Sequence, residues 1–172
     1  MKIIGILTLL CGFIVIQGCC ALGFLVAKDK RSPWEISRDR QAAALAEIAE
    51  TEKTEKGIVV RLKSDILFET GESELSHKAD RQIQRLADVL IKYPGNSITV
   101  VGHTDNVGSN ADNMILSRHR AQSVKNGLVN DGVAPKAVIS RGMGETEPLV
   151  ANDSDEHRAI NRRAELRIQA GE

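Results

Sequence analysis

Asp105, Asn113 and Arg120 are the residues of this sequence whose types and spacing best fit a binding site. Asp105 follows a short apolar run, in a loop that leads into an amphipathic segment. Asn113 and Arg120 lie seven residues apart on that segment, so on a helix they point the same way. A carboxylate accepts hydrogen bonds from an ammonium group, and a guanidinium clamps a carboxylate through two of them. The set matches an amino acid zwitterion; a structural ion pair between Asp105 and Arg120 is the alternative.

The bulk composition excludes several other classes of function. The formal net charge is +0 and the pI is about 6.9, whereas general nucleic-acid binding needs a basic face. Aromatic residues make up only 3% of the chain, so stacking on bases or sugars has little support. Cys11, Cys19 and Cys20 all lie near the N-terminus, and the rest of the sequence therefore has no disulfide framework and no cysteine-based metal site. No cofactor is expected.

An enzymatic role is weakly supported. His103 with His119 or His157 raises the idea of a metal hydrolase, but the spacing is no recognised ligand set. No Ser/His/Asp triad and no paired-carboxylate arrangement stands out either. We therefore expect a protein that is not an enzyme, with a cell-wall amidase as the weak alternative.

The elements that must position these residues alternate between strands and helices. Strands are expected at 57–62, 97–102, 138–141 and 164–168, with helices after Ser76, after the loop 106–110 and at 154–162. Two apolar stripes have helical spacing: Leu75, Ala79, Ile83, Leu86, Leu90 and Tyr93, then Met114, Ser117, Ala121, Val124 and Leu128. This βαβαβ(α)β order predicts an α/β protein, a two-layer sandwich with helices on one face of a four-stranded mixed sheet. Alternation in the last strand predicts that its other face meets solvent.

A set of short motifs accompanies the candidate site at tight spacing. They are Val101-Gly102-His103-Thr104-Asp105-Asn106-Val107-Gly108, Asn113, Leu116-Ser117, Arg120-Ala121, Gly142-Met143-Gly144, Pro148 and Asn161-Arg162-Arg163-Ala164-Glu165. This set, over about residues 57–170, resembles the C-terminal peptidoglycan-binding domain of the OmpA-like family. That family includes Pal-type lipoproteins and MotB-type stator proteins.

The resemblance implies roles for individual residues. Asp105 and Arg120 match the family's principal ligands for the diaminopimelate residue of the peptidoglycan stem peptide, and Asn113 matches a supporting position. Residues Thr104, Phe68, Thr70 and Gly71 are implied to line the same site, although the family often has a polar residue where Gly71 stands. Asn161 and Arg163 match a signature that we interpret as structural and near the site. No metal ligand is implied.

The N-terminal segment predicts attachment to a membrane. An apolar run from Ile3 to Ala27 follows Lys2 and ends at a charged cluster, residues 28–31. In one interpretation Ile16-Gln17-Gly18-Cys19 is a lipobox, so that a signal peptide is cut before Cys19 and this cysteine is lipidated. In the other, residues 1–27 hold an uncleaved transmembrane anchor, since about 20 apolar residues suffice to span a bilayer. Both place residues 28–172 in the periplasm.

Residues 28–56 are expected to form a charged, helical periplasmic linker. The part from Arg38 to Lys56 contains no Gly or Pro and is rich in helix formers. Such a helix would hold the domain at 57–172 about 25–30 Å from the bilayer. Pro33 and Trp34 are expected near the membrane surface, and a weak dimerising helix is the alternative to a spacer. Contacts with other envelope proteins, if any, would lie within residues 34–56.

These features predict non-covalent peptidoglycan binding that tethers a bacterial membrane to the cell wall. The expected location is the periplasmic face of the outer membrane, as a lipoprotein. The alternative is a single-pass inner-membrane component of a stator, secretion or stress-signalling complex. Ion coupling is disfavoured because residues 3–27 contain no Asp, Glu, Lys, Arg or His.

Overall fold

The computed structural model describes residues 31–170. The part of the chain from Arg31 onward forms one compact unit with a hydrophobic core of its own. The helices are α1 (Pro33–Ala46), α2 (Ser64–Leu67), α3 (His77–Lys92), α4 (Asn110–Asn130) and α5 (Asp155–Asn161), with a short 3₁₀ helix at Pro135–Ala137. The strands are β1 (Glu50–Thr54), β2 (Gly57–Lys63), β3 (Asn96–His103), β4 (Val138–Gly144) and β5 (Arg163–Ala170).

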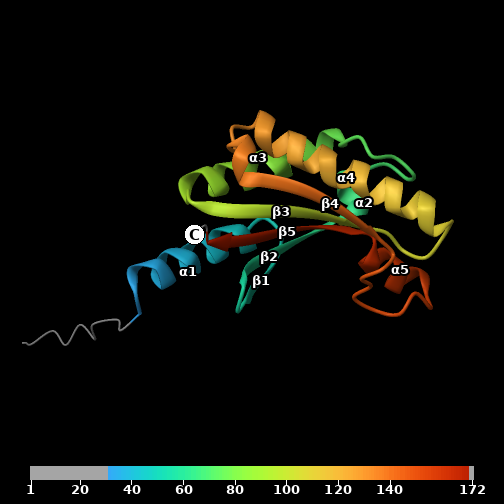
Figure 1. The fold of residues 1–172 in the computed structure, drawn as a ribbon, viewed down its shortest axis with the longest axis horizontal. Helices are drawn as coiled ribbons and strands as arrows, with labels where there is room; N and C mark the ends of the chain where they lie inside the picture. Colours follow the sequence, from blue (N-terminus) through green and yellow to red (C-terminus); the bar gives the residue numbers. More distant parts are fainter. Residues whose placement is uncertain (1–30, 171–172) are drawn as a thin grey trace, which may run out of the picture. The chain divides into compact units, whose positions relative to one another are not determined.

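The strands form one mixed sheet in the order β1-β2-β5-β3-β4. β3 and β4 are parallel, and the other neighbouring strands are antiparallel. Figure 1 shows α3 and α4 side by side above this sheet. The predicted two-layer α/β architecture is thus confirmed, with a fifth strand at the β2 edge of the sheet.

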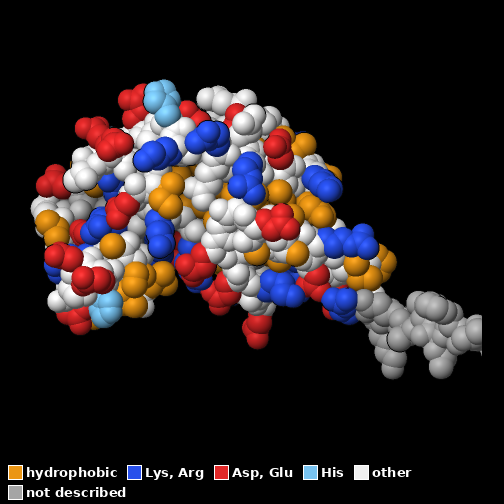
Figure 2. Space-filling model, turned by 180° about the vertical axis from the view of Figure 1, so that it is seen from behind, with side chains coloured by type: hydrophobic (Ala, Val, Ile, Leu, Met, Phe, Trp, Pro, Cys, Tyr) orange, Lys and Arg blue, Asp and Glu red, His pale blue; other side chains and the backbone are white. Residues whose placement is uncertain are grey.

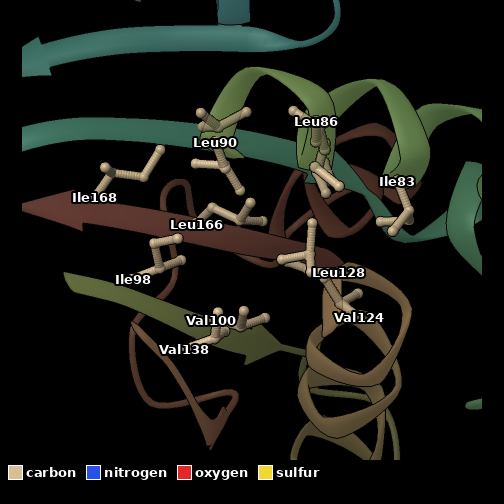
Figure 3. Packing of buried hydrophobic residues seen from close by; sticks show 14 of the residues in the cluster. Ile83, Leu86, Leu90, Ile98, Val100, Val124, Leu128, Val138, Leu166 and Ile168 are labelled. Atoms are coloured by element: carbon tan, nitrogen blue, oxygen red, sulfur yellow. The ribbon is translucent and has the colours of Figure 1, made fainter. Parts of the chain in front are cut away.

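The predicted apolar stripes build the core between the two layers. On α3 the side chains of Ile83, Leu86 and Leu90 are buried, and on α4 Val124 and Leu128 are buried while Met114 is only half-buried. They pack against Ile98 and Val100 of β3, Val138 of β4, and Leu166 and Ile168 of β5 (Figure 3). Apolar side chains that recur every three to four residues on the helices and every second residue on the strands therefore all face this layer.

The segment between residues 33 and 56 differs from its prediction. Its first part is helical, because Ser32 and Glu35 form a reciprocal capping box and Pro33 starts the helix. Its last part is not: Glu50–Thr54 pairs with β2 as an edge strand, so the prediction of a continuous helix from Arg38 to Lys56 is wrong there. Ala42 and Leu45 of α1 join the common core. This segment is therefore packed on the domain and is not a spacer.

The second face of β5 also differs from its prediction. Arg163 and Glu165 alternate with the core residues, as expected, yet each is only 4% exposed. The chain between β4 and α5 covers them, and Arg163 Nη2 donates to the Glu147 carbonyl at 3.1 Å. The strand is therefore buried on both faces at this end, with charged side chains on one of them.

Close backbone packing sets the position of α4 on the sheet. A Cβ atom added to Gly102 in β3 would lie 2.2 Å from the Ser117 carbonyl oxygen, and one on Gly142 in β4 would lie 2.5 Å from the Arg118 nitrogen. Ser117 Oγ, in addition, accepts a hydrogen bond from the Gly144 nitrogen at 2.9 Å. Glycines therefore let α4 approach the strands closely, which fixes the height of Asn113 and Arg120 above the sheet.

Candidate functional site

A cavity of about 570 Å³ lies beyond the C-terminal end of β3. Its walls come from the segment after β2, the loop after β3, the start of α4 and the region around α5. The predicted ligand residues all line it: Phe68, Thr70, Gly71, Thr104, Asp105, Asn113 and Arg120. Ser64, Asp65, Glu69, Val107, Leu116, Asp155, Arg158 and Arg162 complete the wall. The fold thus brings together residues that are far apart in the sequence.

Asp105 presents its carboxylate in a fixed orientation. The residue is 8% exposed, and its Oδ1 accepts a hydrogen bond from the Val107 backbone at 3.1 Å. Its Oδ2 accepts from Arg162 Nη1 at 2.9 Å. The bond from the Val107 backbone, two residues after Asp105, is the usual geometry by which an aspartate side chain stabilises a turn. A carboxylate held in this way can accept a further charged donor without rearranging.

Arg120 is a buried cation with no carboxylate of its own. It is 6% exposed, its Nε donates to the Glu72 carbonyl at 2.9 Å, and its Cζ lies 5.1 Å from the centroid of the Phe68 ring. Among residues 31–170, no carboxylate lies within 4.0 Å of its guanidinium. Burial lowers the pKa of Arg120, and the nearby negative charge of Asp65 opposes that change. The proposed structural ion pair with Asp105 is therefore absent from this site.

Two buried hydroxyl groups in the wall lack partners. Among the described residues, Thr104 Oγ1 and Ser64 Oγ have no hydrogen-bond partner, although both residues are nearly fully buried. Unsatisfied buried polar groups are uncommon and costly. Both residues belong to the cavity wall, so a polar ligand that reaches these hydroxyls would supply the missing partners.

Asn113 supports the site more than it faces a ligand. Its Nδ2 donates to the Asp105 carbonyl oxygen at 3.2 Å and to Glu145 at 2.7 Å. These bonds tie the loop after β3 to α4 and to the chain after β4. Asn113 therefore positions the Asp105 backbone.

Arg162 also lines the cavity, although its position in the sequence predicts no role for it there. It donates to Asp105, and it also forms an ion pair with Asp65 at 3.3 Å. Hydrogen bonding to Asp65, and then to Asp105, raises the pKa of Arg162. The Asn161-Arg162-Arg163 signature contains both arginines. Only the tertiary structure shows that Arg162 lines the cavity while Arg163 is buried.

Asn161 and Arg163, predicted to be structural and near the site, both make hydrogen bonds within the fold. Asn161 Oδ1 accepts from the backbone nitrogens of Leu149 and Val150, which holds the loop before α5. Arg163 donates to Glu165 at 2.8 Å. Burial alone would raise the pKa of Glu165, but the hydrogen bond and charge of Arg163, together with the hydrogen bond from Arg167, outweigh it and keep that pKa below its ordinary value.

His103 lies inside the same buried cluster and predicts a pH dependence. It is 0% exposed, and neither ring nitrogen has a hydrogen-bond partner among the described residues. Burial, reinforced by Arg163, lowers the pKa of His103 from 6.5 to about 4. The folded state therefore binds this proton less readily than the unfolded state. Its contribution to stability is complete above pH 6.5 and is lost as the pH falls from there toward 4.

We expect the free energy of unfolding to fall by about 2 kcal/mol between about pH 7 and about pH 5 because of His103. Urea unfolding at both pH values measures this change. His103→Phe keeps a flat ring without a titrating group, so most of the difference should vanish in that variant. An equal pH dependence in both proteins would contradict the assignment.

The described residues offer no metal site and no membrane span. Within residues 31–170, no group of three or more His, Cys, Asp or Glu side chains is placed to hold a metal ion. No helix in that same range is long and apolar enough to cross a bilayer.

Comparison with known proteins identifies the family. The model of the OmpA family matches residues 67–162, which are more than half of the chain and contain most of the residues that line the cavity. This chain belongs to the OmpA family. Outer membrane porin F of Pseudomonas fluorescens is 39% identical to this OmpA-family chain over 112 residues, which are 65% of the chain and 34% of porin F. The probable lipoprotein YiaD of Escherichia coli K12 is 31% identical over 111 residues, 64% of the chain and 51% of YiaD.

Solved structures agree with the family assignment. A putative MotB-like protein from Desulfovibrio vulgaris superposes with a TM-score of 0.73 at 29% identity, covering 79% of this OmpA-family chain and 93% of that structure. The cell wall anchor of the T6SS from Pseudomonas aeruginosa gives 0.65 at 31% identity, with 77% and 96% covered. The peptidoglycan-associated lipoprotein from Burkholderia pseudomallei gives 0.56 at 26%, with 60% and 88% covered. The chain spans about a third of porin F and about half of YiaD, so the shared part is one domain.

Proposed function

We propose that this protein binds peptidoglycan non-covalently through the diaminopimelate residue of the stem peptide. The observation that carries the proposal is that one cavity holds both a fixed carboxylate and a buried guanidinium with no counterion among residues 31–170. The free end of a diaminopimelate side chain carries an ammonium and a carboxylate on one carbon. Asp105 accepts from the ammonium and Arg120 clamps the carboxylate through charge-assisted hydrogen bonds.

Relatives support the same ligand. The names of two matching structures, a cell wall anchor and a peptidoglycan-associated lipoprotein, refer to the wall. The cavity also suits a polar ligand, since its wall residues Thr104 and Ser64 carry hydroxyls that have no hydrogen-bond partner among residues 31–170. Binding needs no chemical conversion, and the proposed role is that of an anchor and not of an enzyme.

The second part of the proposal is a tether between wall and membrane. It rests on the apolar run from Ile3 to Ala27, which lies outside the described residues. A lipid on Cys19 would fit the outer membrane, and YiaD is named a probable lipoprotein. An uncleaved helix would fit a single-pass inner-membrane complex, which is the alternative. The mass of the mature N-terminus separates the two, since a lipidated Cys19 and an intact Met1 differ by the whole signal segment.

Asp105→Asn tests the ligand assignment. This change keeps the hydrogen bond to the Val107 backbone but removes the charge that receives the ammonium. We expect the affinity for insoluble, diaminopimelate-containing peptidoglycan to fall about tenfold or more, because a charged hydrogen bond contributes about 1.5–3 kcal/mol. Co-sedimentation of residues 31–172 measures the effect.

The matched control is Asp88→Asn, which removes an exposed carboxylate from α3. It should sediment like the unmodified protein. Failure of the unmodified protein to sediment would contradict the proposed function itself. Full retention of Asp105→Asn would contradict only the assigned site.

A further inference from the structure

A second cavity lies at the opposite end of the domain from the peptidoglycan site. It has a volume of about 610 Å³ and is lined by α1, the β1–β2 turn, the α3–β3 turn and the end of β5. We call it the α1 groove; its argued residues are Trp34, Arg38, Gln41, Lys56 and Lys92. β3 begins at this groove with Asn96 and ends beside Asp105, so its eight residues separate the two sites by about 26 Å.

The groove presents hydrogen-bond donors that lack acceptors. Gln41 is 3% exposed, its Oε1 accepts from Asn96 at 3.3 Å, and its Nε2 has no partner among the described residues. Arg38 Nε is likewise buried and without a hydrogen-bond partner in that part of the chain. Arg38 and Gln41 lie three residues apart on α1 and both line the groove, so these two unsatisfied donors favour a ligand with oxygen acceptors.

The charges around the groove indicate that the ligand is anionic. Among the described residues that line it, Arg38, Lys56 and Lys92 are basic and Glu55 alone is acidic. Figure 2 shows Lys and Arg side chains next to hydrophobic ones at the end of the described part that carries α1. Oxygen acceptors with negative charge are the chemistry of a phosphate group, whether free or in a lipid.

An exposed tryptophan selects the lipid surface over a free ion. Trp34 is 58% exposed, and the guanidinium of Arg38 lies 4.9 Å from its ring centroid. Tryptophan beside basic side chains is typical of membrane–water interfaces, where the ring sits at headgroup level. A free phosphate ion would make no favourable contact with this apolar ring.

Chain length brings the same surface to a membrane. Only residues 28–32 lie between the apolar run ending at Ala27 and the first residue of α1, and five residues reach at most about 18 Å. α1 is packed on the domain, so no spacer adds to that reach.

We propose that the α1 groove and Trp34 dock on the phospholipid bilayer in which the N-terminal run is embedded. The proposal rests on the membrane attachment proposed above. Arg38 and Gln41 donate to lipid phosphates, Lys56 and Lys92 add attraction to anionic headgroups, and the Trp34 ring enters the interface. The domain then stands on the membrane with its peptidoglycan site facing away.

The test uses residues 31–172, which contain the whole core and omit the apolar run. Trp34 is the only tryptophan of the sequence, so tryptophan fluorescence reports on this surface alone. With phosphatidylglycerol vesicles we expect a blue-shifted emission that brominated acyl chains quench, and much weaker changes with phosphatidylcholine vesicles. Inorganic phosphate should leave the emission unchanged.

A matched pair of charge variants locates the contact. Lys56→Glu with Lys92→Glu reverses charge at the groove, and Lys63→Glu with Lys78→Glu makes the same change at the other ends of β2 and α3. Each basic side chain near an anionic bilayer contributes about fivefold, so the groove pair should weaken partitioning about 25-fold or more. The control pair should retain most of it.

Three results would overturn the proposal. They are no partitioning of the unmodified fragment at low salt, an equal loss in the control pair, or the same emission change with inorganic phosphate. Co-sedimentation with peptidoglycan, run on the same proteins, reports separately on the Asp105 site. A fragment that binds the wall but not vesicles would refute the docking surface and leave the proposed function intact.

Discussion

Arg120→Ala is expected to lower the affinity for diaminopimelate-containing muropeptides about 30-fold or more. Buried arginines at the centre of a binding site are among the most costly residues to truncate, at about 2–4 kcal/mol. Here the loss includes both hydrogen bonds to the ligand carboxylate and the stacking of the guanidinium on Phe68. The domain should stay folded, because Arg120 has no carboxylate partner among residues 31–170 that would be left behind. Isothermal titration with a soluble muropeptide measures the change.

Arg118→Ala is the matched control for this prediction. Arg118 lies two residues earlier on α4 and is exposed, and it does not line the cavity. Its replacement should change the dissociation constant by less than about twofold, as is usual for a surface position. An equal loss in both variants would indicate a general effect of charge, and normal binding by Arg120→Ala would remove Arg120 from the site.

Glu165→Gln is expected to destabilise the domain by about 3–5 kcal/mol, the usual cost of removing one partner from a buried ion pair. Glu165 is 4% exposed and accepts from both Arg163 and Arg167. The glutamine keeps the shape but leaves the buried Arg163 without its counter-charge. Urea unfolding near neutral pH measures the loss of unfolding free energy.

Two further variants separate charge pairing from other effects. Glu147→Gln removes a half-exposed partner of Arg167 and should cost less than about 1 kcal/mol. Adding Arg163→Met to Glu165→Gln should cost less than the sum of the two single changes, since no buried charge remains unpaired between them. If the losses of unfolding free energy for Glu165→Gln and Arg163→Met simply add, or if Glu165→Gln loses less than about 1 kcal/mol, the ion pair contributes little to stability.

Much of the fold was predictable because its signals are local. The stripe through Ile83, Leu86 and Leu90 with Ser76 as its cap predicts α3, and Ser76 Oγ indeed accepts from the Ala79 nitrogen at 3.2 Å. The alternation in 164–168 likewise predicts β5. Each pattern lies within a single element, and the apolar residues of both patterns are buried in the core.

The segment from Arg38 to Lys56 was predicted less well, because a tertiary contact overrides its helix propensity. Ala, Glu and Lys favour a helix up to Lys56, but Glu50–Thr54 pairs with β2 in the register Glu50 to Arg61 and Thr54 to Gly57. Arg61 then donates to Glu52 at 2.6 Å across the pair. The sequence of residues 38–56 alone does not predict that this strand pairs with β2.

The resemblance predicted candidate site residues that the fold brings together, but it did not predict which of them form ion pairs. The resemblance led to Asp105 and Arg120, and the structure places both in one cavity. The partner of Asp105 is instead Arg162, which is 57 residues away in the sequence. An ion pair between such distant residues depends on how β5 lies beside β3, and no sequence spacing encodes that distance.

The two proposals together give the tether a direction. The proposed peptidoglycan site lies at the C-terminal end of β3, and the α1 groove lies at its start. With α1 packed on the domain, the wall would be held at about the height of the domain above the membrane surface. The span of the domain itself would then take the place of the predicted helical spacer of about 25–30 Å.

The most direct test of the central claim compares two muropeptides that differ only in the third residue of the stem peptide. One carries diaminopimelate and the other carries lysine, which has the ammonium for Asp105 but no side-chain carboxylate for Arg120. Isothermal titration of residues 31–172 should give binding of the diaminopimelate peptide, and at least about tenfold weaker binding of the lysine peptide. Equal affinity for the two peptides would contradict recognition of a zwitterion by Asp105 and Arg120.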